Sequence, residues 1–433
     1  MLDSVGNGKN SVLTVSGIII MKTETTPRFW VQPLFVLYFL LFTVFLFMQA
    51  MNNPANNWDM LGYAGSVKSF ETDDKQEIHD YAFSELEKYV DAEKFQELTS
   101  ESDYRKTVYA DPESFRQVLP WYQIRPIYTG AMYVLTKLGV NVYKASYIVS
   151  ATGVVLGLWV FYFAFRPYIA PVFWFALPFF IVLNDAVRIA RFSSPDSLAF
   201  LWVAILSYFF IRRQRLFLWL LPLSIIVRTD LIFMVGLFLV YLFWFYSVEK
   251  RKTLKMKKGF RLVRSQRGKV VIASVASLGI YLVVNLIFGN YGWATVFHLM
   301  FVSRLNYPAD MVVHVELIQY VSALKHGLPS MLQNNAFDLF VGIFIVMLGL
   351  LLKLKQLRGG FKNLMAERIN ALMLISFLFI IAHYLVFPED DSRFFVAQYM
   401  IGLLSFLALL TRVSDIDPTE EQKLRRNYPE RMK

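Results

Sequence analysis

The sequence of 433 residues contains no cysteine. Disulfide bonds, thiolate metal sites and cysteine nucleophiles are therefore excluded, whereas the redox compartment stays open. A phosphate-binding loop ending in Gly-Lys-Ser or Gly-Lys-Thr is also missing, so nothing in the sequence indicates nucleotide hydrolysis. The five histidines are scattered without the spacing of a zinc protease, which removes a histidine-rich metal site.

Charged residues are few, at 18%, and hydrophobic residues make up 56% of the chain, which has a mean hydropathy of +0.43. Soluble domains stay near roughly 45–50% hydrophobic. Several apolar runs reach the roughly 20 residues that a helix needs to cross a bilayer. The formal charge of +11 does not indicate nucleic acid, because Lys and Arg gather between the apolar runs. The composition predicts an all-α polytopic membrane protein.

About ten apolar runs predict transmembrane helices. The predicted ranges are 30–50, 143–165, 168–184, 197–211, 215–228, 231–248, 270–288, 337–353, 371–387 and 394–411. Residues 249–269 hold ten Lys or Arg against one Glu, and such basic loops stay in the cytoplasm. We therefore expect cytoplasmic tails at 1–29 and 412–433 around one integral-membrane domain, 30–411; Met21 could equally be the first residue. The expected location is a bacterial inner or plasma membrane.

Two long segments, 51–126 and 289–336, fall on the extracytoplasmic side in this topology. The first holds fifteen Asp or Glu against eight Lys or Arg, so it is acidic where the cytoplasmic loops are basic. We expect it to carry juxtamembrane helices. One of them would align Ile78, Ala82, Leu86, Tyr89 and Val90 on one face. That helix would either lie on the membrane surface or pack on its own loop.

Ionisable residues near membrane depth are costly, and they persist mainly where they line a cavity or do chemistry. In this sequence they gather at the outer ends of the predicted helices. The candidate site residues among them are Asp59, Arg125, Arg188, Arg191, Asp196, Arg228, Asp230, His298, Arg304, Glu389, Asp390 and Arg393. Their common side predicts a polar cavity that opens outward.

Asp59 follows the first predicted span in "NNWDMLGYAG", flanked by two aromatic residues at interfacial depth. A carboxylate in such a place is partly desolvated and could act as a general base. It could instead cap a short surface helix that starts at Met60.

Arg188 and Arg191 lie one helical turn apart, a spacing that could clamp a phosphate by charge-assisted hydrogen bonds. The alternative is that both reach toward lipid headgroups. Asp196 follows Pro195 at the start of the next span, where it could contact a substrate or simply favour the helix start.

Arg228 and Asp230 occupy a turn between two apolar spans, either as functional groups or as an ion pair that closes the turn. Arg393 enters the apolar run 394–402 and is the leading candidate for holding a leaving phosphate, with headgroup contact as the alternative. His298 and Arg304 are weaker candidates.

The order of these features resembles the GT-C superfamily of integral-membrane glycosyltransferases, which use polyprenyl-phosphate sugars. The likeness covers most of the chain and is a pattern rather than a diagnostic motif. The stretches that carry it are "WDMLGY" after the first span, "IRPIYTGAMYVLTKLGVNVYKASYIVSATGVVLGLWVFYFAF", "SSPDSLAFLWVAILSYFF" and "SRFFVAQYMIGLLSFLALL". The early acid is single rather than a paired Asp-Glu, and "EDDSRF" is only loosely similar to the His-Lys-Glu-x-Arg-Phe sequence of the eukaryotic mannosyltransferases.

The resemblance implies that Asp59 is the general base and that Arg188, Arg191, Arg228 or Arg393 binds the lipid phosphate. The remaining candidates would contact the substrates in other ways.

The expected function is inverting transfer of a sugar from a polyprenyl-phosphate donor to a hydroxyl of a glycan, lipid or protein acceptor, outside the cytoplasm. No cofactor or resident metal is required, although the carboxylates could take a divalent cation. The alternatives are a lipid-linked glycan transporter, which more often shows duplicated halves, and a glycan polymerase or ligase.

Overall fold

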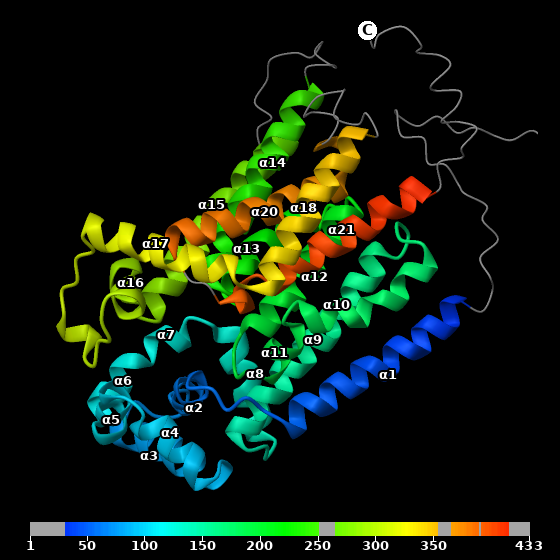
Figure 1. Cartoon of the computed structure of the whole chain (residues 1–433). Coiled ribbons are helices and arrows are strands. Elements are labelled where there is room, and N and C mark those ends of the chain that lie inside the picture. The colour runs from blue at the N-terminus through cyan, green and yellow to red at the C-terminus, as the bar shows by residue number, and fades with distance from the viewer. Residues whose placement is uncertain (1–30, 251–264, 354–364, 389–390, 415–433) are drawn as a thin grey trace, which may run out of the picture.

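The computed structural model describes residues 31–250, 265–353, 365–388 and 391–414, and within these ranges the chain forms helices and connecting turns without a strand (Figure 1). Seven helices in the described part are long and apolar enough to cross a membrane. They are α1 (Val31–Asn52), α9 (Val142–Phe165), α14 (Ile232–Lys250), α15 (Gln266–Ile287), α18 (Asn335–Lys353), α20 (Arg368–Val386) and α21 (Val396–Ser414). The chain is thus an all-α polytopic membrane protein.

Three further apolar segments are helical but shorter: α12 (Asp196–Ile211), α13 (Phe217–Val227) and the pair η1 (Pro171–Ala176) and α10 (Leu177–Leu183). The range 168–184 was predicted as one helix, and the structure breaks it. Pro171 begins the 3-10 helix η1, and Pro178 lies in the first turn of α10. Asp185 then adopts a left-handed conformation, with φ of 64°, and a separate helix, α11 (Ala186–Arg191), follows.

Helices α9 and α12 make a close parallel pair because glycines on α9 leave room for the backbone of α12. A Cβ on Gly153 would lie 3.0 Å from the Ser197 carbonyl, and one on Gly157 would lie 2.5 Å from the Phe200 ring. This Gly-x-x-x-Gly spacing is typical of helices that pack closely in membranes. The two helices run in the same direction, and the contact of Gly153 with Ser197 fixes their relative position. The first residue of α12, Asp196, therefore lies about 16 Å along α9 from the start of that helix.

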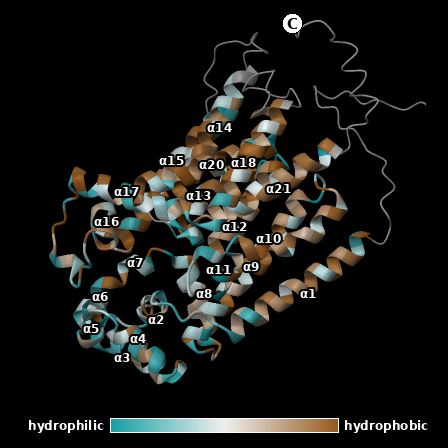
Figure 2. Cartoon of the chain, viewed as in Figure 1, coloured by the Kyte–Doolittle hydropathy of each residue, from teal (hydrophilic) through white to brown (hydrophobic). Residues whose placement is uncertain are grey.

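The first outer segment folds into seven short helices: α2 (Asp59–Lys68), α3 (Lys75–Tyr89), α4 (Ala92–Ser100), α5 (Asp103–Ala110), α6 (Pro112–Val118), α7 (Pro120–Gln123) and α8 (Pro126–Lys137). They are the hydrophilic part of the molecule, below the hydrophobic bundle in Figure 2. Side chains cap the starts of α3 to α6 by accepting hydrogen bonds from backbone N–H groups. The capping residues are Asp74, Asp91, Ser102 and Asp111.

The apolar face predicted on α3 is covered by protein and not by lipid. Ile78, Ala82 and Leu86 are buried in a core shared with α2 and α6. Of the two predicted placements, packing on its own loop is the one found. The hydrophobic effect favours it because the short helices of this segment can bury their apolar faces against one another.

The second outer segment contains α16 (Trp293–Phe301), η3 (Pro308–Asp310) and α17 (Leu317–Leu332). It attaches to the first by hydrogen bonds: Tyr307 donates to the Asp111 carboxylate at 2.6 Å, and Ser114 donates to the Asn306 carbonyl at 2.7 Å. Tyr384 of α20 donates to the Leu324 carbonyl of α17. The two segments, 53–141 and 288–334, thus form one outer lobe at one end of the bundle (Figure 1).

Candidate functional site

A cavity of about 700 Å³ lies between the outer lobe and the bundle. Its walls come from α2, α5, α7, α12, α16, α20 and the turns around η2 (Thr229–Leu231) and η5 (Ser392–Phe394). Seven of the residues singled out from the sequence line it: Asp59, Arg125, Asp196, Arg228, Asp230, Arg304 and Arg393. The late start of α12 lets this polar cavity reach into the depth of the bundle.

Asp59 is held at the cavity wall by two partners. Its Oδ2 accepts a hydrogen bond from Arg393 Nη1 at 2.9 Å, and its Oδ1 accepts one from the Tyr122 hydroxyl at 3.4 Å. The side chain keeps 27% of its surface exposed, so the carboxylate remains accessible from the cavity. Asp59 is the first residue of α2, and the cap position is occupied by Trp58 without a side-chain hydrogen bond. The predicted cap at a surface helix is therefore wrong, since α2 itself is largely buried.

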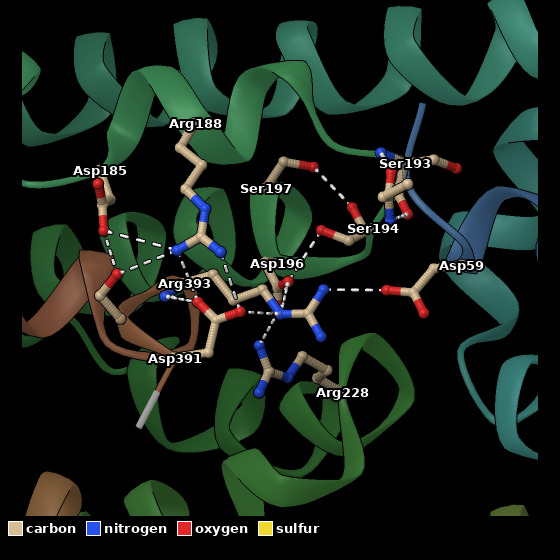
Figure 3. Close-up of polar contacts among 12 residues, drawn as sticks. Asp59, Asp185, Arg188, Ser193, Ser194, Asp196, Ser197, Arg228, Asp391 and Arg393 are labelled. Carbon is tan, nitrogen blue, oxygen red and sulfur yellow. Dashed lines mark hydrogen bonds and ion pairs between the residues drawn. The ribbon is translucent and has the colours of Figure 1, made fainter. Parts of the chain in front are cut away.

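Arg393 connects three carboxylates (Figure 3). Besides Asp59, its Nε lies 3.2 Å from Asp391 Oδ2 and 3.8 Å from Asp196 Oδ2. The ring of Phe394 lies under this guanidinium, with the centroid 5.0 Å away, and also under that of Arg228, at 4.8 Å. The turn at η5 therefore provides both a cation and an aromatic ring that lies close to this cation and to Arg228.

Arg228 forms the most buried ion pair of the cavity. Its Nε and Nη2 donate to both oxygens of Asp230 at 2.7 and 2.6 Å, and its Nη1 pairs with Asp196. Asp196 is 3% exposed and also accepts from Ser194 Oγ at 2.8 Å. His383 Nε2 lies 3.3 Å from Asp230. The ion pair predicted to close the turn is present, and its members line the cavity as well.

The arginines of α11 do not line the cavity. Arg188 donates two hydrogen bonds to Asp391, at 2.9 and 3.2 Å, as Figure 3 shows. Arg191 donates from Nε to the Asn53 carbonyl at 2.6 Å and so secures the chain after α1. Both arginines therefore donate hydrogen bonds to other groups of the protein. These contacts differ from the phosphate clamp predicted from the sequence and from its alternative, contact with lipid headgroups.

Arg125 and Arg304 line the cavity and differ from Arg228 and Arg393 in their partners. Within the described residues neither has a carboxylate partner: Arg125 donates to the Trp121 carbonyl, and Arg304 Nη1 lies 3.9 Å from Met300 Sδ. Their positive charges are therefore available to an anion in the cavity. By contrast, His298 lies outside the lining, near Ser303 Oγ, and Glu389 and Asp390 fall outside the described residues.

Three tyrosines also line the cavity: Tyr63, which flanks Asp59 in the sequence, and Tyr104 and Tyr122, which the sequence did not single out. Burial raises the pKa of Tyr63, Tyr104 and Tyr122 well above the ordinary value, so these phenols stay protonated and can donate hydrogen bonds. Tyr104 and Tyr122 lie in the first outer segment without any motif around them. Only the fold, which places α5 and α7 across from Asp59, reveals them.

Apolar side chains also line the cavity. Val296, Leu299 and Met300 of α16 face the cavity together with Val386 and Phe387 at the end of α20. The cavity lining thus combines charged side chains with hydrocarbon side chains, a combination that suits an amphiphile. In the described part of the chain no three Asp, Glu or His side chains are grouped to hold a metal ion.

The chain has no match among protein-family models, curated proteins or solved structures. The contacts around the cavity therefore carry the functional argument that follows.

Proposed function

We propose that the chain is a glycosyltransferase of GT-C-like architecture that moves a sugar from a polyprenyl-phosphate donor to an acceptor hydroxyl, with inversion, on the extracytoplasmic face. One observation carries the proposal: an accessible carboxylate, Asp59, shares a cavity with two arginines that have no carboxylate partner among the described residues, Arg125 and Arg304. A general base and a cationic phosphate site are the two parts that such a transfer needs.

Asp59 is the proposed base. Arg393 and Tyr122 fix the orientation of its carboxylate while leaving part of it exposed to the cavity. The acceptor oxygen forms a bond to the anomeric carbon as the bond to the phosphate oxygen breaks, and the hydroxyl proton passes to Asp59. Attack opposite to the leaving polyprenyl phosphate inverts the anomeric carbon.

Arg125 and Arg304 are the proposed contacts of the donor phosphate. The charges of Arg228 and Arg393 are already balanced by the carboxylates of Asp196, Asp230, Asp391 and Asp59. A phosphate therefore gains most from the two unbalanced guanidiniums, which can each donate two hydrogen bonds. Arg393 then serves chiefly to position Asp59.

The polyprenyl chain suits the apolar wall formed by α16 and the end of α20. Val296, Leu299 and Phe387 offer it a surface next to the phosphate contacts. A soluble nucleotide sugar would have no use for such a wall, and none is supplied outside the cytoplasm.

The topology supports the same proposal. The first residue of α1 and the last residues of α21 lie at the same end of the bundle, away from the outer lobe (Figure 1). This fits ten passages, seven by long helices and three by the shorter apolar segments, with both termini in the cytoplasm. The basic loop 249–269 then also lies in the cytoplasm, in a bacterial inner or plasma membrane.

The test is sugar transfer by purified protein from synthetic polyprenyl-phosphate sugars. Asp59→Asn should lower the transfer rate about 100-fold or more, because a general base typically contributes that much. Asp80→Asn is the control: Asp80 of α3 is exposed and lies outside the cavity lining. This control should retain most of the activity, and thermal unfolding should show both variants folded.

Equal transfer by Asp59→Asn and the wild type would show that Asp59 is not the base. If the wild type transfers no sugar from any donor but moves a fluorescent lipid-linked glycan across vesicle membranes, the protein is a transporter. Mass spectrometry of the product distinguishes transfer of one sugar from transfer of a polymer.

A further inference from the structure

A second polar cavity lies at the other end of the bundle. It has a volume of about 400 Å³, and its lining residues are Gln32, Phe163, Arg166, Pro167, Tyr208 and Arg212. These residues come from the start of α1 and from the ends of α9 and α12. Since α12 starts at the first cavity and ends at the second, the two cavities are about 24 Å apart along that helix.

The parallel pairing of α9 and α12 brings the two arginines together. Arg166 directly follows the last residue of α9, and Arg212 directly follows the last residue of α12. The close contact at Gly153 and Gly157 keeps the two helix ends adjacent. A positive side chain is favourable at a helix C-terminus, so the fold tolerates both charges there without a carboxylate.

Both guanidiniums are oriented without being neutralised. Arg166 Nη2 donates to Gln32 Oε1 at 2.6 Å, and its guanidinium lies 6.0 Å from the Tyr162 ring centroid. Arg212 lies 5.8 Å from the centroid of Tyr208. Neither has a carboxylate partner in the described part of the chain, unlike Arg188, Arg228 and Arg393. Most of their N–H donors are thus left for a ligand.

We propose that this cavity binds the phosphate group of an anionic lipid headgroup. Two convergent guanidiniums match the tetrahedral oxygens of a phosphate. Phe163, which also lines the cavity, is 48% exposed on the side of α9 that would face lipid, so it gives acyl chains a surface beside the headgroup. General attraction of basic loops to lipid requires neither a cavity nor oriented arginines. The proposal is independent of sugar transfer.

The test uses the full-length protein, stripped of lipid in detergent. Phosphatidylglycerol, phosphatidylcholine and inorganic phosphate are titrated separately, with bound lipid counted by native mass spectrometry and thermal stability measured in parallel. We expect phosphatidylglycerol to bind and to raise the melting temperature. Arg166→Gln/Arg212→Gln should weaken its binding about tenfold or more, as expected for the loss of charge-assisted hydrogen bonds.

Arg215→Gln is the matched control, because Arg215 is exposed at the same end of the bundle but outside the cavity lining. Equal weakening by the control would show that general charge, and not the cavity, attracts the lipid. Arg166→Lys/Arg212→Lys keeps the charge and loses the planar fork, so unchanged binding by that variant would also overturn the proposal, even if the glutamine variant fails to fold. Binding of inorganic phosphate in place of the lipid would show that the ligand is a soluble anion.

Discussion

Arg393 and Arg228 show how a few side chains make a charged site stable at membrane depth. Each guanidinium contacts a carboxylate from a distant part of the chain, and the ring of Phe394 lies close to both cations. A buried ion costs several kcal/mol unless partners compensate it. The carboxylates of Asp196 and Asp230 therefore compensate the charge of the buried Arg228, in addition to any role that they have in the cavity.

Removing the Arg228 side chain should therefore destabilise the protein strongly. We expect Arg228→Met to lower the free energy of unfolding by roughly 3–5 kcal/mol, because Asp196 would remain buried with only the more distant Arg393 guanidinium, at 3.8 Å, as a cationic partner. Arg188→Met is the comparison: Arg188 is 40% exposed, so its pair with Asp391 should contribute about 1 kcal/mol or less. Unfolding in detergent measures both, and equal losses would contradict this assignment.

The two arginines without carboxylate partners in the described structure should matter for donor binding instead. Arg304→Gln should raise the KM for a polyprenyl-phosphate sugar about tenfold and change kcat little, since a charge-assisted hydrogen bond is worth roughly 1.5–3 kcal/mol. Arg116→Gln removes an exposed charge of the same lobe that does not line the cavity. An unchanged KM in Arg304→Gln, or an equal rise in the control, would place the phosphate elsewhere.

The sequence identified many of these side chains as candidate site residues, but it did not indicate which of them form ion pairs with one another. Charges such as Asp59, Arg228 and Arg393 stand out because they interrupt or adjoin apolar runs, and hydropathy reports their depth. It does not report which side of a helix they occupy or which helices are neighbours. The pairing of Arg188 with Asp391, 203 residues away, follows only from the fold.

Among the helices, the contact between α9 and α12 sets the geometry of both cavities. The glycines on α9 determine how closely α12 approaches, and α12 begins with Asp196 and ends directly before Arg212. The sequence predicted both helices from their apolar runs. It did not predict the break at 171–191, because a mean over apolar residues gives little weight to two prolines and a left-handed Asp185.

Gly157→Ala should destabilise the protein even though alanine favours helices. The new Cβ would lie 2.5 Å from the Phe200 ring and 3.1 Å from the Leu201 backbone, so the helices would have to separate. Gly279→Ala in α15 meets nothing within 4 Å and should be neutral or stabilising by about 0.5–1 kcal/mol. Thermal unfolding measures both, and a stable Gly157→Ala would show that this contact does not hold the two helices together.

Across the chain as a whole, the outer lobe and the second cavity should lie on opposite sides of the membrane. Because the chain has no cysteine, single cysteines can be introduced without a prior knockout. Lys106→Cys, exposed on α5, should react with a membrane-impermeant maleimide in intact cells. Arg215→Cys, exposed between α12 and α13, should react only after permeabilisation. Labelling of both from outside would overturn the topology.

The contact between Asp59 and Arg393 spans 334 positions of the chain and has a consequence for biosynthesis. A ribosome makes the N-terminal acid first, and the arginine emerges only when the last helix, α21, is about to follow. Until then Asp59 lacks its ionic partner and Asp196 has only Arg228. A nascent chain that ends before Arg393 therefore has no complete site, and the protein becomes competent only after the segment that carries Arg393 has been made and has packed against α2.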